Sequence, residues 1–278
     1  MKRIFITYGD EKFVEAKRKI MEEARQTGEF DEVMSYGYDD LSDELKNSKI
    51  IKEPRGGGMW SWKPDVIYST MQNANDGDII VYCVSGCTVQ KSKEWKLYWE
   101  KLLHHDIIAQ RILMRNDHYT RKELIDKYIE TNGYGWPFCY QCQATVIIIV
   151  VGNLTRTFVK EWREIMIHQS HLVVDVTQQE RPSQHPTLIE NRHDQAVYSA
   201  LIYKYLRIPE YRNKIYTCWE RTEDCTLFRK QAIRATRLRL GQEEILKFHV
   251  KRMFKRIIKH YIIIPFVLAP LQWWYNKK

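Results

Sequence analysis

The chain has 278 residues, of which 44% are hydrophobic and 28% charged, a globular composition that excludes a disordered chain and leaves enough length for a sizeable core. Lys and Arg number 44 against 35 Asp and Glu, and the formal charge of +9 suits nucleic acid, an anionic membrane or phosphorylated ligands without choosing among them. No long apolar segment follows the first residues, so we expect no secretory signal peptide and a reduced, cytoplasmic setting for the six cysteines.

The cysteines give little support to a metal site. Cys139 and Cys142 form a single CxxC motif, and no second pair lies at the spacing of a zinc ribbon. We interpret them as ordinary buried thiols, with zinc as the alternative.

The first hundred residues predict strands and helices in alternation. The apolar run Ile4–Tyr8 predicts a buried strand, a helix follows from about Gly9 to Gln26, and Val33–Tyr36 predicts a second strand. This β-α-β start is typical of a nucleotide-binding α/β layer, although no GxGxxG motif supports an NAD-type site. Further along we expect an exposed connection over 39–53, a helix from Pro64 to about Asn73, a strand over Ile79–Val84 and a helix over Glu94–Leu103.

The second half of the chain continues in the same way. A capping box at Thr120–Glu123 predicts a helix that ends near Asn132-Gly133, and the β-branched run Thr145–Val151 predicts a central strand. We expect a helix over Thr155–His168, a surface loop over 177–190 and a helix from about Asp194 to Tyr205. Together these elements predict a Rossmann-type α/β fold, a twisted and mostly parallel sheet flanked by helices, in one domain over residues 1–230.

Residues 231–278 differ in composition. They are dense in Lys and Arg, with one apolar helical face between 245 and 261, and end in an apolar stretch that contains Pro265, Pro270 and Trp273-Trp274. A spanning helix needs about 20 unbroken apolar residues, which this stretch lacks. We predict a basic amphipathic helix that holds the protein peripherally on an anionic membrane surface. The alternative is a helix packed on the domain with its basic face in solvent.

Residues 55–64 read Arg-Gly-Gly-Gly-Met-Trp-Ser-Trp-Lys-Pro, a pattern suited to a phosphorylated ligand. The glycines allow backbone N–H groups to approach a ligand closely, and Arg55 and Lys63 have the charge to hold a pyrophosphate. Trp60 and Trp62 offer flat faces for a base or a sugar. The alternative is a plain turn with both tryptophans in the core.

Polar residues also lie at the ends of predicted strands and at the start of a predicted helix. Thr7, Tyr8 and Gly9 end the first strand, and residues 85–87 follow the strand over Ile79–Val84, where ligands of open α/β sheets bind. Arg192, His193, Asp194 and Gln195 cluster at the start of a helix, and a helix N-terminus favours anions. The alternative is that Asp194 only caps the helix and Arg192 is a surface charge.

In their order and their residues, these segments resemble GT-A-type glycosyltransferase-like proteins of surface-polysaccharide biosynthesis, including capsule, lipopolysaccharide and viral glycans. Their pattern is a strand and a glycine, then RGxGYWxWKP, GDxxxYxDxGC, an apolar QxGxxxx strand and helix, and HRHDQSxxS. This chain has RGGGMWSWKP, GDIIVYCVSGC, QCQATVIIIV and ENRHDQAVYSA in that order, over about residues 1–205.

The resemblance implies a GT-A-like fold that transfers a sugar from a nucleoside-diphosphate sugar to a hydroxyl of a glycan or glycolipid. It implies that Asp194 is the catalytic or acceptor-binding carboxylate and that His193 contacts phosphate or metal. The implied donor-binding residues are Thr7, Tyr8, Gly9, Arg55, Trp60, Trp62, Lys63, Ser85 and Arg192.

One departure from the pattern concerns the metal. Val84 stands where the pattern has the Asp that contributes to a Mg²⁺ or Mn²⁺ site with the nucleotide. Either the metal is held by other ligands, or Arg55, Lys63 and Arg192 replace it, or catalysis has been lost.

Two other functions stay open at this point. A non-catalytic glycan- or membrane-binding relative would explain Val84. A nucleic-acid-binding protein would explain the basic charge, but the sequence has no recognised binding motif, so we expect no nucleic-acid partner.

Overall fold

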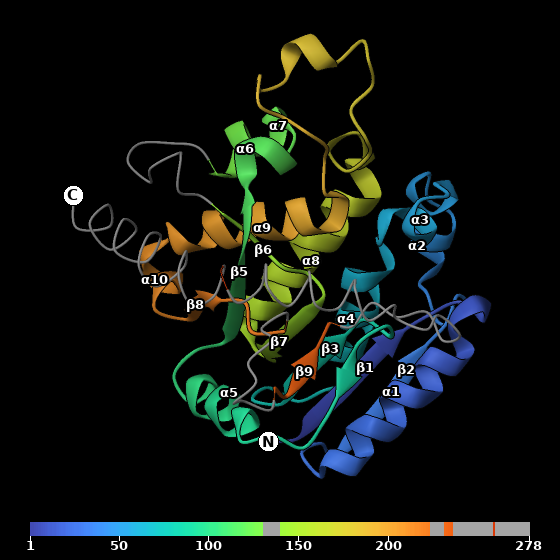
Figure 1. The fold of residues 1–278 in the computed structure, drawn as a ribbon, viewed down its shortest axis with the longest axis vertical. Coiled ribbons are helices and arrows are strands. Elements are labelled where there is room, and N and C mark those ends of the chain that lie inside the picture. Colours follow the sequence, from blue (N-terminus) through green and yellow to red (C-terminus); the bar gives the residue numbers. More distant parts are fainter. Residues whose placement is uncertain (130–139, 223–230, 236–257, 259–278) are drawn as a thin grey trace.

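The computed structural model describes residues 1–129, 140–222, 231–235 and 258. In this part of the chain a central sheet lies between helices on both of its faces (Figure 1). The strands of this sheet are β1 (Arg3–Tyr8), β2 (Glu32–Tyr36), β3 (Ile79–Cys83), β5 (Ile107–Arg115), β6 (Tyr140–Cys142), β7 (Val146–Val150) and β8 (Ile215–Trp219). The longer helices are α1 (Val14–Thr27), α4 (Trp62–Gln72), α5 (Glu94–Leu102), α8 (Asn153–His168) and α9 (His193–Leu206). The shorter helices are α2 (Asp43–Lys46), α3 (Gly56–Met59), α6 (Asn116–Tyr119), α7 (Lys122–Leu124) and α10 (Pro209–Arg212).

The sheet has the strand order β2-β1-β3-β7-β5-β6, and β8 also pairs with β5. β1 is parallel to both β2 and β3, and β8 is parallel to β5. β7 runs antiparallel to its neighbours β3 and β5, and β6 is antiparallel to β5. The predicted α/β fold is confirmed, and antiparallel pairings around β7 join the parallel ones. Because β2, β1 and β3 are parallel, their carboxyl ends share one edge of the sheet.

Two hydrophobic cores lie on opposite faces of the sheet because successive side chains of a strand alternate. Ile4 and Ile6 of β1 belong to the core that contains residues of α4, α8 and α9. Phe5, between them, belongs to the core that contains residues of α1 and α5. All five residues of β3 are buried, as expected for a central strand covered on both faces.

Three strands of the central sheet, β5, β6 and β8, were not predicted. β5 is buried only in its first half and half-buried beyond it, and β8 is half-buried after its first residue. Neither is a continuous apolar run, so their strand character depends on pairing with each other and with β6 and β7. The helix predicted from Thr120 is a short α7 followed by a π-helical turn (Ile125–Ile129), and its predicted end near Asn132-Gly133 lies outside the described residues.

Residues 231–235 pack with the domain. β4 (Thr88–Val89) pairs antiparallel with β9 (Ile233–Arg234), and Ala232 and Ile233 are buried in the second core. The Glu94 carboxylate accepts a hydrogen bond from the Ala232 N–H at 2.7 Å. The described fold therefore continues past residue 230 to residue 235. Apart from Ile258, the rest of the predicted amphipathic helix and aromatic end lies outside the described residues.

None of the described helices combines the length and the apolar character needed to cross a membrane.

Candidate active site

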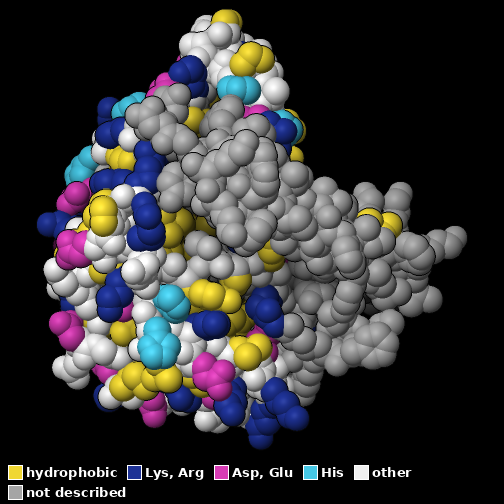
Figure 2. Space-filling model, turned by 90° about the vertical axis from the view of Figure 1, so that its left-hand side faces the viewer, with side chains coloured by type: hydrophobic (Ala, Val, Ile, Leu, Met, Phe, Trp, Pro, Cys, Tyr) yellow, Lys and Arg dark blue, Asp and Glu magenta, His cyan; other side chains and the backbone are white. Residues whose placement is uncertain are grey.

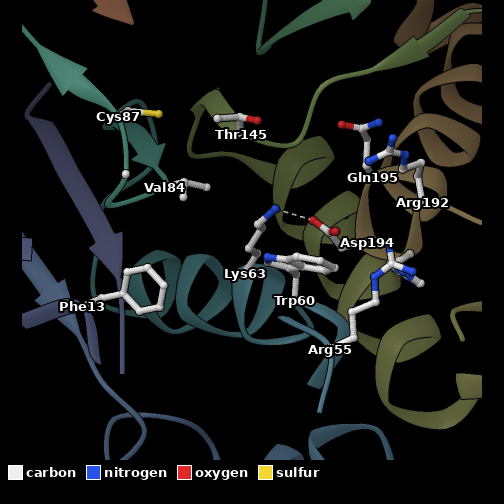
Figure 3. A pocket seen from close by; sticks show the side chains of 12 residues that line it. Phe13, Arg55, Trp60, Lys63, Val84, Cys87, Thr145, Arg192, Asp194 and Gln195 are labelled. Carbon is white, nitrogen blue, oxygen red and sulfur yellow. Dashed lines mark hydrogen bonds and ion pairs between the residues drawn. The ribbon is translucent and has the colours of Figure 1, made fainter. Parts of the chain in front are cut away.

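A cavity of about 350 Å³ lies at the carboxyl ends of β1 and β3 (Figure 3). Val84 follows β3 directly, and Phe13 belongs to the short 3-10 helix after β1. The walls come from the turn before α4, the loop after β3, the residue before β7 and the start of α9. The lining residues are Phe13, Arg55, Trp60, Lys63, Val84, Gly86, Cys87, Thr145, Arg192, His193, Asp194 and Gln195.

The three glycines before α4 form a left-handed turn. Residues 56–60 all have positive φ angles, between 53° and 91°, a region that glycine adopts without steric cost. A Cβ atom on Gly58 would lie 2.8 Å from the Ile51 Cα. The N–H groups of residues 57–61 all donate to carbonyls of residues 53–58, so they do not face a ligand. These hydrogen bonds favour the interpretation as a turn over that as a phosphate cradle.

Lys63 and Asp194 form a buried ion pair that joins α4 to α9 (Figure 3). Lys63 Nζ donates to Asp194 Oδ2 at 2.5 Å, and the two side chains are 7% and 4% exposed. Burial raises the pKa of the Asp194 carboxyl, and the Lys63 charge opposes that effect. α9 begins at His193, with Arg192 as the N-cap residue, so Asp194 pairs with Lys63 in the first helical turn and is not the cap.

The two arginines of the cavity are also paired with carboxylates. Arg55 donates to both oxygens of Asp175, at 3.1 and 3.2 Å, and to Glu190 at 3.2 Å. Arg192 lies 2.8 Å from the other oxygen of Glu190. Together with the pair of Lys63 and Asp194, the described residues at the cavity thus include three cations and three carboxylates that are paired with one another. The cations are Arg55, Lys63 and Arg192, and the carboxylates are Asp175, Glu190 and Asp194.

His193 connects the start of α9 to two other parts of the site. Its backbone is left-handed, with φ of 51°, which is uncommon for a residue other than glycine. Its Nδ1 donates to the Val173 carbonyl at 2.8 Å, and its ring stacks on Trp60 with centroids 5.6 Å apart. The Trp60 indole in turn packs against Gly56, where a Cβ atom would come within 2.5 Å of the ring. Much of the Trp60 ring is therefore covered by protein.

The Gln195 amide is oriented by a chain of hydrogen bonds. Gln141 Nε2 donates to the Tyr119 carbonyl at 2.7 Å and to Thr120 Oγ1 at 2.9 Å, so its Oε1 must accept. Gln195 Nε2 donates to that oxygen at 2.6 Å. The remaining Gln195 oxygen points toward Thr145 across the cavity (Figure 3). This fixed acceptor suits a ligand hydroxyl or N–H.

Five predicted donor-binding residues do not line the cavity as the described residues form it: Thr7, Tyr8, Gly9, Trp62 and Ser85. Tyr8 and Trp62 are buried and stack on each other, with ring centroids 4.2 Å apart, and burial raises the pKa of Tyr8 to about 12. Thr7 and Ser85 are also buried, and the Gly9 N–H donates to the Tyr36 carbonyl at 3.2 Å. Trp62 is therefore a core residue, as in the alternative interpretation of residues 55–64.

Six predicted site residues do meet at the cavity: Arg55, Trp60, Lys63, Arg192, His193 and Asp194. Sequence reasoning missed Phe13, Thr145 and Asp175, and it placed Cys87 at a strand end and Gln195 at a helix start without giving either a role. Gln195 follows Asp194 directly in the NRHDQ segment, so that motif carried a signal for it. Asp175 lies in a polar connection with no motif of its own, and only the fold brings it to Arg55.

Two observations concern the predicted loss of a metal-binding Asp at position 84. Val84 lines the cavity, so the position that carries Asp in the resembling pattern presents an apolar side chain there. Across the described residues, no group of three or more His, Cys, Asp or Glu side chains is placed to hold a metal ion. Cys142 is a buried free thiol, and Cys139 lies outside the described residues.

Figure 2 shows one face of the described surface. Lys and Arg lie there among acidic, histidine and hydrophobic side chains.

No protein-family model matches the chain, and no curated protein matches it. Solved structures that match include the galactosyltransferase LgtC in complex with donor and acceptor sugar analogues, with 12% identity over 80% of this chain and 74% of that chain, and a TM-score of 0.42. Mouse xyloside xylosyltransferase 1 is 10% identical over 81% and 87% of the two chains, with a TM-score of 0.41. A glycosyltransferase involved in the glycosylation of the major capsid of PBCV-1 is 8% identical over 81% and 84%, with a TM-score of 0.40. All three TM-scores lie below 0.5, so the function has to be inferred from the residues of this chain.

Proposed function

We propose that the protein is a glycosyltransferase that moves a sugar from a nucleoside-diphosphate sugar to a hydroxyl of a glycan or glycolipid. The observation that carries this proposal is the meeting of the RGGGMWSWKP and NRHDQ segments in one cavity at the carboxyl ends of parallel strands. Lys63 and Asp194, 131 residues apart, are in direct contact there. These are the two most specific segments of the sequence resemblance.

The cavity has two chemically different sides, which suits such a donor (Figure 3). Phe13, Val84 and Cys87 form an apolar and aromatic side, fitted to the face of a nucleobase. Arg55, Arg192 and the Gln195 oxygen form the polar side, fitted to a diphosphate and sugar hydroxyls.

The transfer requires the acceptor oxygen to bond to the anomeric carbon while the bond from that carbon to the diphosphate oxygen breaks. The diphosphate leaves with the electron pair, and the acceptor hydroxyl gives its proton to a base, for which the Asp194 carboxylate is the proposed residue. Asp194 is the proposed catalytic or acceptor-binding carboxylate, and Lys63 supplies the counter-charge that supports an ionised carboxylate in this buried position. The arginines would stabilise the leaving diphosphate, which requires them to exchange part of their contacts with Asp175 and Glu190.

The direct test is a thermal-shift and calorimetric screen of the full chain against UDP-, GDP-, CMP- and dTDP-sugars, with and without Mn²⁺. We expect at least one donor to bind and Arg55→Gln to weaken that binding. Arg18→Gln is the matched control, because Arg18 is an arginine of α1 with two carboxylate partners outside the cavity. Failure of every donor to bind, or equal binding by both variants, would contradict the proposal.

Val84 favours a second candidate, a relative that binds donor or glycan without transferring sugar. The same screen separates the two when it is followed by an assay for release of the nucleoside diphosphate. A donor that binds but is neither hydrolysed nor transferred would indicate the non-catalytic relative.

A further inference from the structure

Two carboxylates from separate parts of the loop before α9 hold the two arginines of the cavity. Arg55 Nη1 donates to both oxygens of Asp175, and Arg55 Nη2 donates to Glu190. Arg192 Nη2 lies 2.8 Å from the other oxygen of Glu190, so Glu190 bridges the two guanidinium groups. Arg192 Nε is enclosed without a partner among the described residues. The acidic pair, Asp175 and Glu190, therefore leaves part of the Arg192 guanidinium without an acceptor.

The acidic pair contacts the arginines in the way a diphosphate would. It carries a negative charge on each of two neighbouring groups, and between them these groups contact both Arg55 and Arg192. A guanidinium group binds carboxylate and phosphate oxygens in the same geometry. The acidic pair and a diphosphate thus require the same N–H donors, and both cannot hold them at once.

The ion pairs of Arg55 and Arg192 lie in contact with solvent. Their side chains are 42% and 40% exposed, and those of Asp175 and Glu190 are 49% and 31% exposed. Exposed ion pairs stabilise a fold only weakly, because water and salt compete for both charges. Lys63, by contrast, is buried with Asp194. Arg55 and Arg192 are therefore the cations of the cavity that an incoming anion takes over at the smaller cost.

The backbone beneath the acidic pair is held by buried side chains. Asn191 Nδ2 lies within 3.2 Å of the carbonyl oxygens of Leu172–Val174, and the nearest of these is at 2.8 Å. Arg121, 1% exposed, donates to the carbonyls of Val174 and Asp175 at 3.5 and 3.4 Å. Because these contacts fix the backbone, an exchange of partners requires rotation of side chains and no opening of the loop.

We propose that Asp175 and Glu190 are internal competitors of the donor diphosphate, which lower its affinity by occupying Arg55 and Arg192 until it binds. This inference rests on the proposed function, because it takes a diphosphate as the group that displaces them. The apparent affinity for an anion falls with the fraction of molecules in which the carboxylates hold the arginines. The nucleoside diphosphate released by the transfer carries the same group, so the competition also favours its departure.

The test uses inorganic pyrophosphate as the probe and titration calorimetry of the full chain. We expect Asp175→Asn and Glu190→Gln each to bind pyrophosphate about two- to fivefold more tightly than the unmodified chain, because each removes a charge that competes for a guanidinium. Carboxylates that served only to hold the loop would give the opposite result, weaker or unchanged binding. Circular dichroism and thermal melting show whether each variant is folded.

Two further variants make the test specific. Glu44→Gln is the matched control, because Glu44 is an exposed carboxylate that pairs with Arg163 at 2.6 Å, outside the cavity, and its loss should leave the affinity unchanged. In a chain that already carries Arg55→Gln, Asp175→Asn should give no gain, since Asp175 acts through Arg55. A gain that persists without Arg55, equal or weaker binding by both single variants, or no pyrophosphate binding by any protein would overturn the competition.

Nucleotide sugars, titrated into the same proteins, separate this inference from the proposed function. A donor that binds the unmodified chain, with an affinity that neither Asp175→Asn nor Glu190→Gln increases, would overturn the competition and leave the glycosyltransferase standing. Pyrophosphate binding that both substitutions tighten, without binding of any nucleotide sugar, would leave the competition at the arginines standing and overturn the glycosyltransferase.

Discussion

At the scale of single residues, the ion pair of Lys63 and Asp194 dominates the site. Both side chains are almost completely buried, so each charge depends on the other for its stability. Removing one partner leaves an uncompensated buried charge, whereas replacing both with apolar residues of similar size leaves none.

We therefore predict that Lys63→Ala destabilises the fold by about 3–5 kcal/mol. The double variant Lys63→Met/Asp194→Leu should recover most of that loss and still lack transfer activity, because the carboxylate is gone. Urea unfolding measures the stabilities, and release of nucleoside diphosphate measures activity. A double variant that stays active would remove Asp194 from the proposed mechanism.

At the scale of elements, the left-handed turn over residues 56–60 supports the ring of His193 through Trp60. Gly56 and Gly57 have similar φ angles, 61° and 56°, but different surroundings. A Cβ atom on Gly56 would come within 2.5 Å of the Trp60 ring, whereas on Gly57 the nearest atom would be 3.9 Å away.

This difference makes the two glycines a matched pair. We predict that Gly57→Ala costs about 1–2 kcal/mol of stability from backbone strain alone. Gly56→Ala adds a steric conflict with Trp60, so it should cost more and also weaken donor binding by shifting His193. Denaturant unfolding and donor titration of both variants check this, and equal effects would contradict the proposed link between Trp60 and His193.

The loop over residues 173–191 should make stability depend on pH through Glu180. Hydrogen bonds from Thr177 and from Arg121 lower the pKa of Glu180 to about 2, below its unfolded value of about 4.3. A carboxyl with a depressed folded pKa stabilises the fold above its unfolded pKa, and that contribution disappears as the pH falls toward 2.

The prediction is that Glu180→Gln lowers the unfolding free energy at neutral pH and that the difference from the unmodified chain shrinks between about pH 4.5 and pH 2. Urea unfolding at a series of pH values measures it. A difference that stays constant down to pH 2 would show that Glu180 does not anchor this loop.

At the scale of the whole molecule, the open question is how the basic C-terminal sequence is used. Residues 231–235 are packed in the second core, so a membrane-binding role concerns only the residues beyond them. Each Lys or Arg near an anionic surface contributes about 1 kcal/mol, and salt screens that attraction.

We predict that the full chain sediments with anionic liposomes at low salt and is released at high salt. Replacing six basic residues by Gln should abolish sedimentation without unfolding the domain, and neutral liposomes serve as the control. The residues are Lys247, Lys251, Arg252, Lys255, Arg256 and Lys259. Sedimentation that survives these changes would favour the alternative in which the segment packs on the domain.

Local sequence patterns were sufficient to predict the α/β class and most of the central elements. β1, β3 and β7 are short apolar runs, and α1 and α8 have apolar residues at helical spacing, so each pattern lies within one element and is readable without its neighbours. Arg55, Lys63, Arg192 and Asp194 were predicted as site residues for a similar reason, because their motifs are contiguous.

Which residues come into contact depends on the packing of the folded chain. β5 and β8 are strands because they pair with each other, and Trp62 is a core residue because it stacks on Tyr8. Asp175 reaches Arg55 from 120 residues away, and Asp194 reaches Lys63 from 131 residues away. Contacts of this kind depend on how α4, α9 and the loops pack on one face of the sheet, and no local pattern of side chains encodes that packing.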